Sequence, residues 1–196
     1  MPPACFTPPS HLITQHSDLK PTNPVSEAEE WFAIRTRQDF RAAETLRQTC
    51  AEVYFPTEMV TGPTGNRRQR AVIPHVVFIR TTATNALRLE ADGRQNPGTI
   101  PMWVYRYPDS KEIQTIPQRQ MDLLKLLTAD DPTRCHIYNV RDFRPTQRVR
   151  VTGGIFAGYE GSVVRVARNR HVAVQIEGIC LILLPYVHPD LLHPLE

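Results

Sequence analysis

The stretch RVRVTGGIFAGYEGSVVRV, residues Arg148–Val166, places four of the chain's nine glycines within ten residues. A phosphate-binding P-loop requires a G-x-x-x-x-G-K-[ST] pattern that leads into a helix, whereas these glycines precede the lysine-free, β-branched run Ser162–Val166. The flanking valine-arginine alternation has period two, as does the later run His171–Glu177, and this period is typical of half-buried strands. Glycines between such strands adopt positive φ at tight turns. Together with the apolar run Cys180–Leu184, these short strands predict a small closed β-barrel over residues 148–196.

The composition indicates a globular protein with a packed core, because hydrophobic residues make up 41% of the chain and charged residues 22%. No apolar run approaches the ~20 residues that a membrane-spanning helix needs, so no membrane partner is expected. The first ten residues, MPPACFTPPS, contain neither the basic nor the apolar region of a secretory signal. The four cysteines are far apart and form no C-x-x-C pair. We therefore expect a cytoplasmic protein with reduced thiols and with no metal site or cofactor.

Positive charge is concentrated in one segment of the chain. The formal net charge is +3, and residues 31–82 hold eight arginines against four acidic residues. Arginine suits bidentate contact with phosphate and stacking on bases, which favours a nucleic-acid partner. A solvated surface without a partner explains the same charge, and charge alone leaves both interpretations open.

The chain divides into four segments by composition and periodicity. Residues 1–29 hold six of the eighteen prolines and predict an extended, disordered leader. Residues 30–128 predict an α+β domain in which helices pack on a mostly antiparallel sheet. Residues 129–147 lack a strong period and predict a linker to the barrel over residues 148–196.

Within the second segment, the expected order is strand, helix, strand, strand, strand, helix. Asp39 is expected to cap the first helix, and Pro56 to interrupt the second strand. Thr61–Arg70 is expected to form a flexible hairpin tip, and the residues from 83 to 101 a polar connection. The expected elements are the strands 31–37, 52–60, 71–80 and 102–107 and the helices 39–50 and 117–127.

Two groups of motifs resemble one family. The C-terminal stretch matches the KOW motif, in which a basic-apolar strand is followed by Gly-x-Phe-x-Gly-x-x-Gly and a valine-rich strand. Gly154, Phe156, Gly158 and Gly161 stand at its glycine and phenylalanine positions. The segments WFAIRTR, EVYFPT, VIPHVVFIR and IPQRQMDLLKLL are similar to the N-terminal domain of NusG. From Trp31 to Glu196, the chain thus resembles the NusG family of transcription elongation factors, whose KOW domain is an SH3-like β-barrel.

The chain departs from the family pattern at one site. The family usually has Pro-Gly-Tyr before the core of its third strand, where this chain has Pro74-His75-Val76. Together with the proline-rich leader and a shortened loop between the second and third strands, this substitution indicates a specialised paralogue. The chain looks most similar to the operon-specific antiterminators associated with surface polysaccharide gene clusters.

The resemblance implies a non-enzymatic factor that binds the clamp helices of RNA polymerase and promotes processive elongation or antitermination. It implies three sets of site residues, and for each the alternative is a packing or solvated role. The polymerase-binding set is Tyr54, Phe55, Pro56, Pro74, Val76 and Phe78. The nucleic-acid-binding set, for the non-template DNA strand, is Arg37, Arg41, Arg67, Arg68 and Arg70. The barrel-loop set, for the termination factor Rho or a small-subunit ribosomal protein, is Ile155, Phe156 and Tyr159.

Other functions stay open at this point. One is a housekeeping NusG that couples polymerase to Rho or the ribosome. Another is a KOW-containing ribosome- or RNA-binding protein, which predicts a more basic barrel than residues 148–196, whose net charge is +1. An enzyme is the poorest hypothesis, because no Ser/His/Asp grouping or paired carboxylate cluster stands out. His188 and His193 alone are a weak metal-binding pattern.

Overall fold

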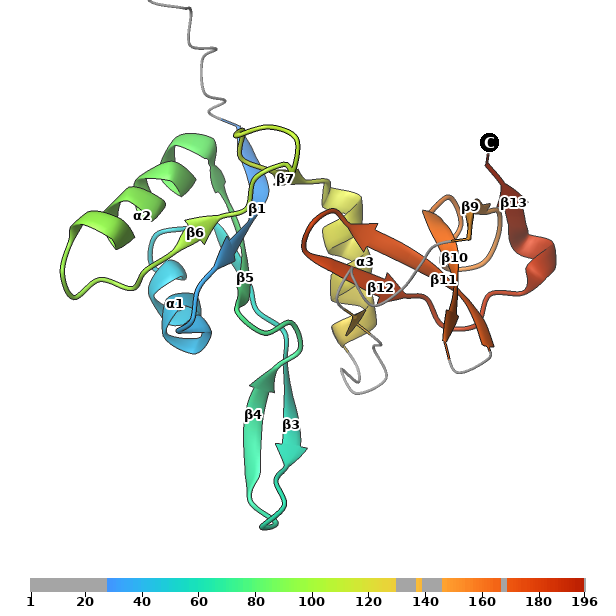
Figure 1. The fold of residues 1–196 in the computed structure, drawn as a ribbon, viewed down its shortest axis with the longest axis horizontal. Coiled ribbons are helices and arrows are strands. Elements are labelled where there is room, and N and C mark those ends of the chain that lie inside the picture. Colours follow the sequence, from blue (N-terminus) through green and yellow to red (C-terminus); the bar gives the residue numbers. More distant parts are fainter. Residues whose placement is uncertain (1–27, 130–136, 139–145, 167–168, 196) are drawn as a thin grey trace, which may run out of the picture.

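The computed structural model describes residues 28–129, 137–138, 146–166 and 169–195 (Figure 1). Nearly all of the predicted leader 1–29 and most of the predicted linker 129–147 lie outside the described residues. The disorder expected of the leader therefore stays a prediction.

The N-terminal part of the chain is built on a five-stranded antiparallel sheet. Its strands are β2 (Glu52–Tyr54), β5 (Val76–Thr82), β1 (Glu29–Arg35) and β6 (Trp103–Val104) in that order, and β7 (Thr115–Ile116) also pairs with β1. The central strand β1 is buried from residue 31 to residue 34. This continuous apolar run reflects burial on both faces, which a strand in the middle of a covered sheet requires.

Helices cover both faces of this sheet (Figure 1). α1 (Asp39–Leu46) and α2 (Ala83–Gln95) pack on the face that carries Phe32 and Ile79. α3 (Gln118–Ala129) packs on the opposite face, where Met121 and Leu124 belong to the same cluster as Trp31 and Phe78. The α+β class and the mostly antiparallel sheet are confirmed.

The helix α2 corrects the prediction of a polar connection after residue 82. The N-cap of this helix is Thr82, whose Oγ1 accepts a hydrogen bond from the backbone N–H of Asn85 at 3.2 Å. Its buried positions are Ala83, Ala86, Leu89 and Glu90. Because two of these are alanines and one is a carboxylate, the apolar period is weak although the spacing is helical.

A two-stranded hairpin, β3 (Thr57–Thr61) with β4 (Arg67–Ala71), projects from the sheet (Figure 1). The predicted interruption at Pro56 is confirmed, since β2 ends and β3 begins on either side of it. Arg67, Arg68 and Arg70 lie within strand β4 rather than in the expected flexible tip, although their side chains are exposed.

The C-terminal part is a six-stranded antiparallel sheet in the order β13-β9-β10-β11-β12-β8. No pairing between the two outer strands β13 and β8 is found among the described residues, so the predicted closed barrel is not confirmed. The strand β8 lies inside the predicted linker and pairs with β12. The bounds are β8 Ile137–Tyr138, β9 Gln147–Val151, β10 Glu160–Val166, β11 Asn169–Ile176, β12 Cys180–Leu183 and β13 Leu192–Pro194, with a 3₁₀ turn at Pro189–Leu191.

The glycine cluster serves two different purposes in this sheet. Gly154 and Gly158 have φ of +75° and +80°, which confirms their predicted turn role. Gly161 lies inside β10, where it does not have a positive φ. A Cβ at this position would overlap the carbonyl oxygen of Ala173 on β11. Gly161 therefore permits the close approach of two strands, and the bend predicted there is wrong.

One hydrophobic cluster joins the two sheets. We define the covered face as Trp31, Ala33, Tyr54, Val76 and Phe78 of the N-terminal sheet. Besides α3, the residues that pack on it come from β11, β12 and the turn between them. They are Ile176, Ile179, Cys180 and Ile182.

Four hydrogen bonds from side chains accompany this apolar contact, and one of them runs from Gln120 Nε2 to the Gln175 carbonyl at 3.4 Å. Gln114 Nε2 donates to the Glu177 carbonyl at 2.7 Å, and Arg119 Nη2 donates to the Ala157 carbonyl at 2.9 Å. The Tyr159 hydroxyl donates to the Arg119 carbonyl at 3.2 Å. Within the described part of the chain, no helix has the length and apolar character needed to span a membrane.

Candidate functional site

The turn into strand β5 holds a residue in an unusual backbone conformation. His75 has a φ of 65°, in the left-handed region that non-glycine residues seldom adopt. Asp39 Oδ2 accepts the His75 N–H at 3.1 Å, and the His75 carbonyl accepts the Thr36 N–H at 3.0 Å. Asp39 Oδ1 also accepts the N–H of Phe40 at 3.0 Å. These bonds hold the turn although its φ is unfavourable.

The expected capping role of Asp39 is therefore wrong. The N-cap of α1 is Gln38, which makes no side-chain cap hydrogen bond, and Asp39 is the first residue of the helix. Its carboxylate instead connects α1 to the turn at His75. The geometry is one that the glycine of the pattern described above adopts without strain, and nothing in the structure explains its replacement by His75.

Replacing His75 by glycine is expected to raise the free energy of unfolding by about 1 kcal/mol or less, because relief of left-handed strain exceeds the added chain entropy. Urea unfolding at unchanged m-value measures this difference. His75→Ala serves as the control, since it removes the imidazole and keeps the Cβ that causes the strain. A His75→Gly protein less stable than wild type would contradict this account.

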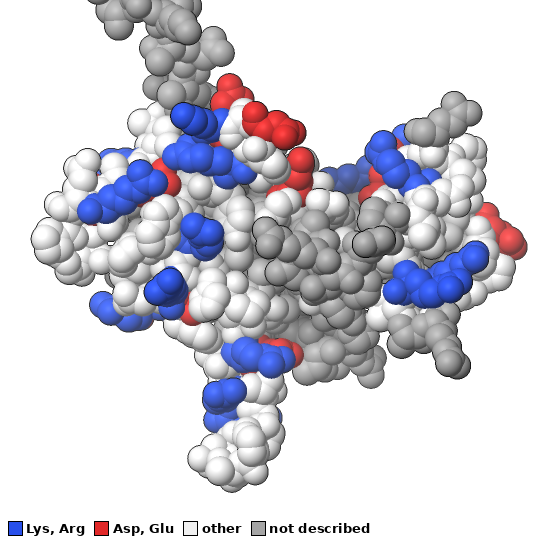
Figure 2. All heavy atoms as spheres, viewed as in Figure 1, with Lys and Arg blue, Asp and Glu red and all other residues white. Residues whose placement is uncertain are grey.

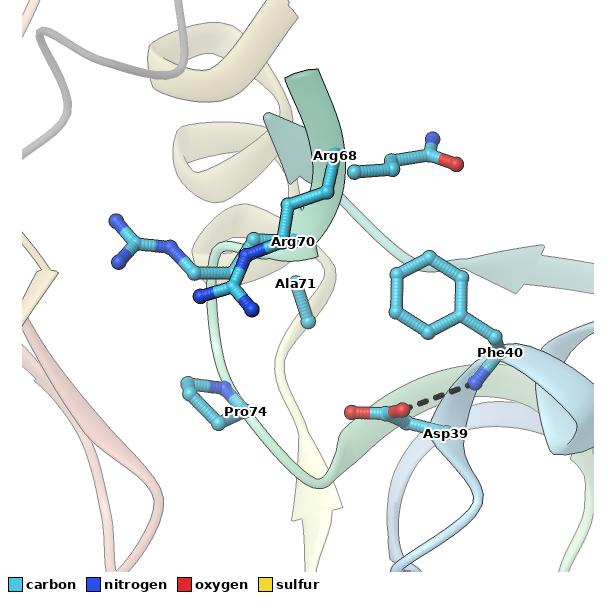
Figure 3. Close-up of a pocket in the computed structure, with 7 residues that line it drawn as sticks. Asp39, Phe40, Arg68, Arg70, Ala71 and Pro74 are labelled. Atoms are coloured by element: carbon cyan, nitrogen blue, oxygen red, sulfur yellow. Dashed lines mark hydrogen bonds between the residues drawn. The ribbon is translucent and has the colours of Figure 1, made fainter. Parts of the chain in front are cut away.

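A cavity of about 290 Å³ lies beside this turn, between the start of α1 and strand β4 (Figure 3). In Figure 3 the side chains of Arg68 and Arg70 extend from the hairpin, while Asp39 and Phe40 come from the helix. The Phe40 ring is 42% exposed and meets Phe55 edge-on, with ring centroids 5.1 Å apart. The remaining lining residues are Gln69, Ala71 and Pro74.

The two cavity arginines differ in their partners. Arg70 pairs with Glu58, with Nε at 2.9 Å and Nη2 at 2.5 Å from the same carboxylate oxygen. Arg68 has no carboxylate partner among the described residues. The cavity thus combines an exposed aromatic ring with an available guanidinium, a combination that suits a stacked base and its phosphate.

The predicted polymerase-binding residues do not lie on one surface. Tyr54, Val76 and Phe78 share the covered face, where Val76 is 4% exposed and Phe78 is fully buried. Phe55 packs against the cluster on the opposite face of the sheet. Pro56 is buried and Pro74 is exposed at the cavity. Strand alternation explains the split, because adjacent residues point to opposite faces.

Helix α3 is tied to the covered face by polar groups as well as by packing. The hydroxyls of Tyr54 and Thr128 share a hydrogen bond. Lys125 Nζ lies 4.5 Å from the Trp31 ring centroid and forms an ion pair with Glu52 at 2.6 Å. These contacts keep α3 at one edge of the face while the C-terminal sheet covers the rest.

The other predicted nucleic-acid residues are exposed near the start of α1. Arg37 precedes the helix, and Arg41 Nη1 donates to Gln38 Oε1 at 2.7 Å. Arg67, Arg68 and Arg70 lie on β4. Five arginines are thus divided between the hairpin and the start of α1 with the residues before it. Of this set, Arg68 and Arg70 line the cavity, and Arg37, Arg41 and Arg67 do not.

The predicted loop for a further partner is partly used inside the protein. Ile155 is 78% exposed, whereas Phe156 is 6% exposed and packs in the core of the C-terminal sheet. The Tyr159 ring lies 4.5 Å from the Arg119 guanidinium carbon, so it contacts α3. Nearby, the hydrogen bond from Arg150 is the main cause of a lowered pKa for Glu160.

Two residues of the contact between the sheets were missed at the sequence level, Gln114 and Arg119. Both are polar residues with no sequence feature that indicates such a contact, and only the fold shows that they face the C-terminal sheet. Gln114 Oε1 is buried and has no hydrogen-bond partner among the described residues. In the part of the chain that the structure describes, no group of three or more His, Cys, Asp or Glu residues could hold a metal ion.

The fold and the site define a class of protein. It is an α+β domain that has a buried apolar face in contact with another part of the protein and arginine-rich flanks. Residues 29–125 match the family model described as "Transcription termination factor nusG". This match supports a NusG-like transcription elongation or antitermination factor. Members of that family are non-enzymatic, and their domain of this kind is known to bind RNA polymerase. The comparison with curated proteins found no match.

Proposed function

We propose that this chain binds RNA polymerase through the covered face and promotes processive elongation or antitermination at specific operons. The NusG family domain at residues 29–125 supports the general role. The observation that carries the proposal is the covered face itself. It is a contiguous apolar surface that includes Trp31, Val76 and Phe78, and it is shielded by a separate sheet.

Docking of a helix pair on this face uses ordinary protein recognition. Apolar and aromatic anchors in a groove supply most of the binding energy in such contacts. Polymerase and the C-terminal sheet then compete for the same residues. The apparent affinity for polymerase equals the intrinsic affinity multiplied by the fraction of molecules in which the C-terminal sheet leaves the face open.

The contact between the sheets has a feature that favours separation. Gln114 Nε2 donates a hydrogen bond to the Glu177 carbonyl, while Gln114 Oε1 is buried and finds no partner in the described part of the chain. An unsatisfied buried acceptor costs about 1–3 kcal/mol. Separation of the sheets lets water hydrate this oxygen, which offsets part of the cost of exposing apolar surface.

The arginines around the cavity supply a second contact in this proposal. Arg37 and Arg41 near α1, with Arg67, Arg68 and Arg70 on β4, bind the non-template DNA strand beside polymerase. The exposed Phe40 ring next to Arg68 supports this role, because base stacking and phosphate contact are then available at one site. A DNA contact of this kind gives an antiterminator its preference for particular operons.

The C-terminal sheet is proposed to be a KOW domain of the SH3-like class. Ile155 is available in the arrangement described, and Tyr159 becomes available when the sheet leaves α3. Rho or a small-subunit ribosomal protein is the proposed partner of this loop, and Phe156 supports the loop from inside. The proposed location is the cytoplasm.

Two adjacent residues on β2 and just after it test the proposed polymerase contact. Tyr54→Ala removes a ring from the covered face, and Phe55→Ala removes one from the opposite face. We expect Tyr54→Ala to weaken polymerase binding about tenfold or more, as truncation of an aromatic anchor does. Phe55→Ala is expected to bind within about twofold of wild type. Its ring lies on the opposite face, and residues away from the central anchors of an interface contribute little to binding.

The measurement is the affinity of each protein for an assembled elongation complex, followed by the dwell time of polymerase at pause sites. Thermal unfolding of both variants checks that they are folded. Equal losses in two folded variants would contradict the assignment of the covered face. Absence of any polymerase binding by the wild-type chain would favour the ribosome- or RNA-binding alternative.

A further inference from the structure

A second arginine-rich cavity lies at the outer edge of the N-terminal sheet, away from the hairpin. It has a volume of about 270 Å³ and is formed where β6 meets α2 and the end of β1. Its charged residues are Arg35, Arg94, Arg106 and Glu90, and its aromatic residues are Trp103 and Tyr105. Lysine and arginine side chains gather on the N-terminal part of the molecule in the same region as α2 and β6 (Figure 2).

The buried carboxylate of Glu90 organises two of these arginines. The Glu90 side chain is 6% exposed, and each of its carboxylate oxygens accepts a hydrogen bond from one arginine guanidinium. Arg106 Nη2 donates to Oε2 at 2.6 Å, and Arg94 Nη2 donates to Oε1 at 3.2 Å. The Arg106 and Arg94 side chains are still 36% and 57% exposed, so their other N–H groups are available to a ligand.

The third arginine is placed against an aromatic ring. Arg35 and Trp103 are opposite each other on β1 and β6, and the Arg35 guanidinium carbon lies 5.8 Å from the centre of the Trp103 ring. The Trp103 side chain is half-buried. No carboxylate of the described residues pairs with Arg35, so three arginines face one acidic group in this cavity.

A planar ring beside guanidinium groups matches the chemistry of a nucleotide. The indole offers a face on which a base can stack, and the arginines offer paired donors to a phosphate. Burial is the main cause of a raised pKa for Tyr105, and the Arg35 charge opposes this rise. An acidic peptide would use the charges but would leave the ring without a role.

The geometry points to a second nucleic-acid site, in which Trp103 stacks on a base of a single strand while Arg35, Arg94 and Arg106 bind its phosphates. This site is separate from the proposed DNA contact on the hairpin. The cavity is smaller than those that usually enclose drug-sized ligands, which fits one nucleotide of a longer strand. A strand that continues along the surface places its other nucleotides outside the cavity.

The test measures binding of the full chain to a fluorescein-labelled oligothymidylate of about 12 nucleotides, a length within the range that single-strand sites cover. Fluorescence anisotropy gives the affinity, without polymerase, at several salt concentrations. The variants are Trp103→Leu, which keeps apolar volume and removes the stacking face, and Arg35→Gln at an exposed position. Arg165→Gln on the C-terminal sheet is the matched control, and Arg68→Gln reports the separate DNA contact proposed on the hairpin.

Loss of stacking is expected to weaken binding about tenfold in Trp103→Leu, and Arg35→Gln is expected to lower the salt slope by about one unit. In wild type the oligonucleotide should quench tryptophan fluorescence, and this quenching should disappear in Trp103→Leu, where Trp31 is the remaining tryptophan. A change in folding alone would leave no such signature, and the exposed Arg35 change gives a second measurement independent of core packing.

Three results would overturn the inference. The first is unchanged affinity in both Trp103→Leu and Arg35→Gln. The second is equal weakening by Arg165→Gln, which would indicate non-specific charge attraction. The third is displacement of the oligonucleotide by polyglutamate together with normal binding by Trp103→Leu, which would make the cavity a site for acidic peptides. Because polymerase is not in the assay, none of these results bears on the proposed polymerase contact.

Discussion

Ile179→Glu is expected to detach the C-terminal sheet from the N-terminal domain. Ile179 is 9% exposed and lies in the turn between β11 and β12, where it packs on the cluster that includes the covered face. Burial of an isoleucine side chain contributes about 1.5–3 kcal/mol, and a carboxylate at this position must also be hydrated. The position is outside the strands, so the C-terminal sheet itself should remain folded.

The thiol of Cys180 reports this separation. Cys180 is 2% exposed within the same cluster, so a thiol reagent reaches it when the sheets separate. We expect labelling of Cys180, followed by peptide mass spectrometry, to be about tenfold faster or more in Ile179→Glu, since about 1.4 kcal/mol changes an equilibrium tenfold.

Ile155→Glu is the matched control for this experiment. It makes the same chemical change on the same sheet at a side chain that is 78% exposed. Its Cys180 labelling rate should equal that of wild type. Equal rates in Ile179→Glu and wild type would show that this contact does not hold the sheets together.

Gly161→Ala is expected to destabilise the C-terminal sheet by about 3 kcal/mol or more, in the range of severe overpacking. The added Cβ would overlap the Ala173 carbonyl oxygen and lie 3.0 Å from the carbonyl carbon. These are backbone atoms, so β10 and β11 must move apart to accept it. Urea unfolding followed by circular dichroism measures the loss.

Gly154→Ala separates this clash from the general cost of replacing a glycine. Gly154 has a φ of +75°, but a Cβ there would have no heavy atom within 4 Å. Only the left-handed backbone is penalised, at about 1–2 kcal/mol. A Gly161→Ala protein as stable as Gly154→Ala would contradict the close approach of β10 and β11.

Strand periodicity carried the most reliable information in the sequence. The apolar side chains that alternate in the two runs, Val149, Val151, Val172, Val174 and Ile176, are all buried. Alternation fixes which side chains share a face, because the period of a strand is two. It does not show whether the last strands close into a barrel, since closure depends on pairings between residues far apart in sequence.

The helix α2 was missed because its packing does not depend on large apolar residues. Ala83 and Ala86 allow it to lie close to the sheet, and Glu90 is buried only because two arginines neutralise it. One of those arginines, Arg106, comes from the residues after β6. A local pattern could not show this partner.

The contact between the two sheets could not be predicted from the sequence either. Phe78 and Ile182 each follow the pattern of an ordinary buried strand residue, and nothing local shows that they belong to the same cluster. The predicted polymerase set mixed two faces for a similar reason. Tyr54 and Phe55 are neighbours in sequence, but the sheet directs them to opposite sides.

Polymerase affinity of the wild-type, Ile179→Glu and Ile155→Glu chains is the most direct test of the covered face as the polymerase contact. Removing a competitor from a partly closed protein raises apparent affinity by the reciprocal of the open fraction. The account predicts that Ile179→Glu binds an elongation complex about tenfold more tightly than wild type, in step with Cys180 labelling, and that Ile155→Glu does not. An Ile179→Glu chain that exposes Cys180 but binds polymerase no better than wild type would contradict it.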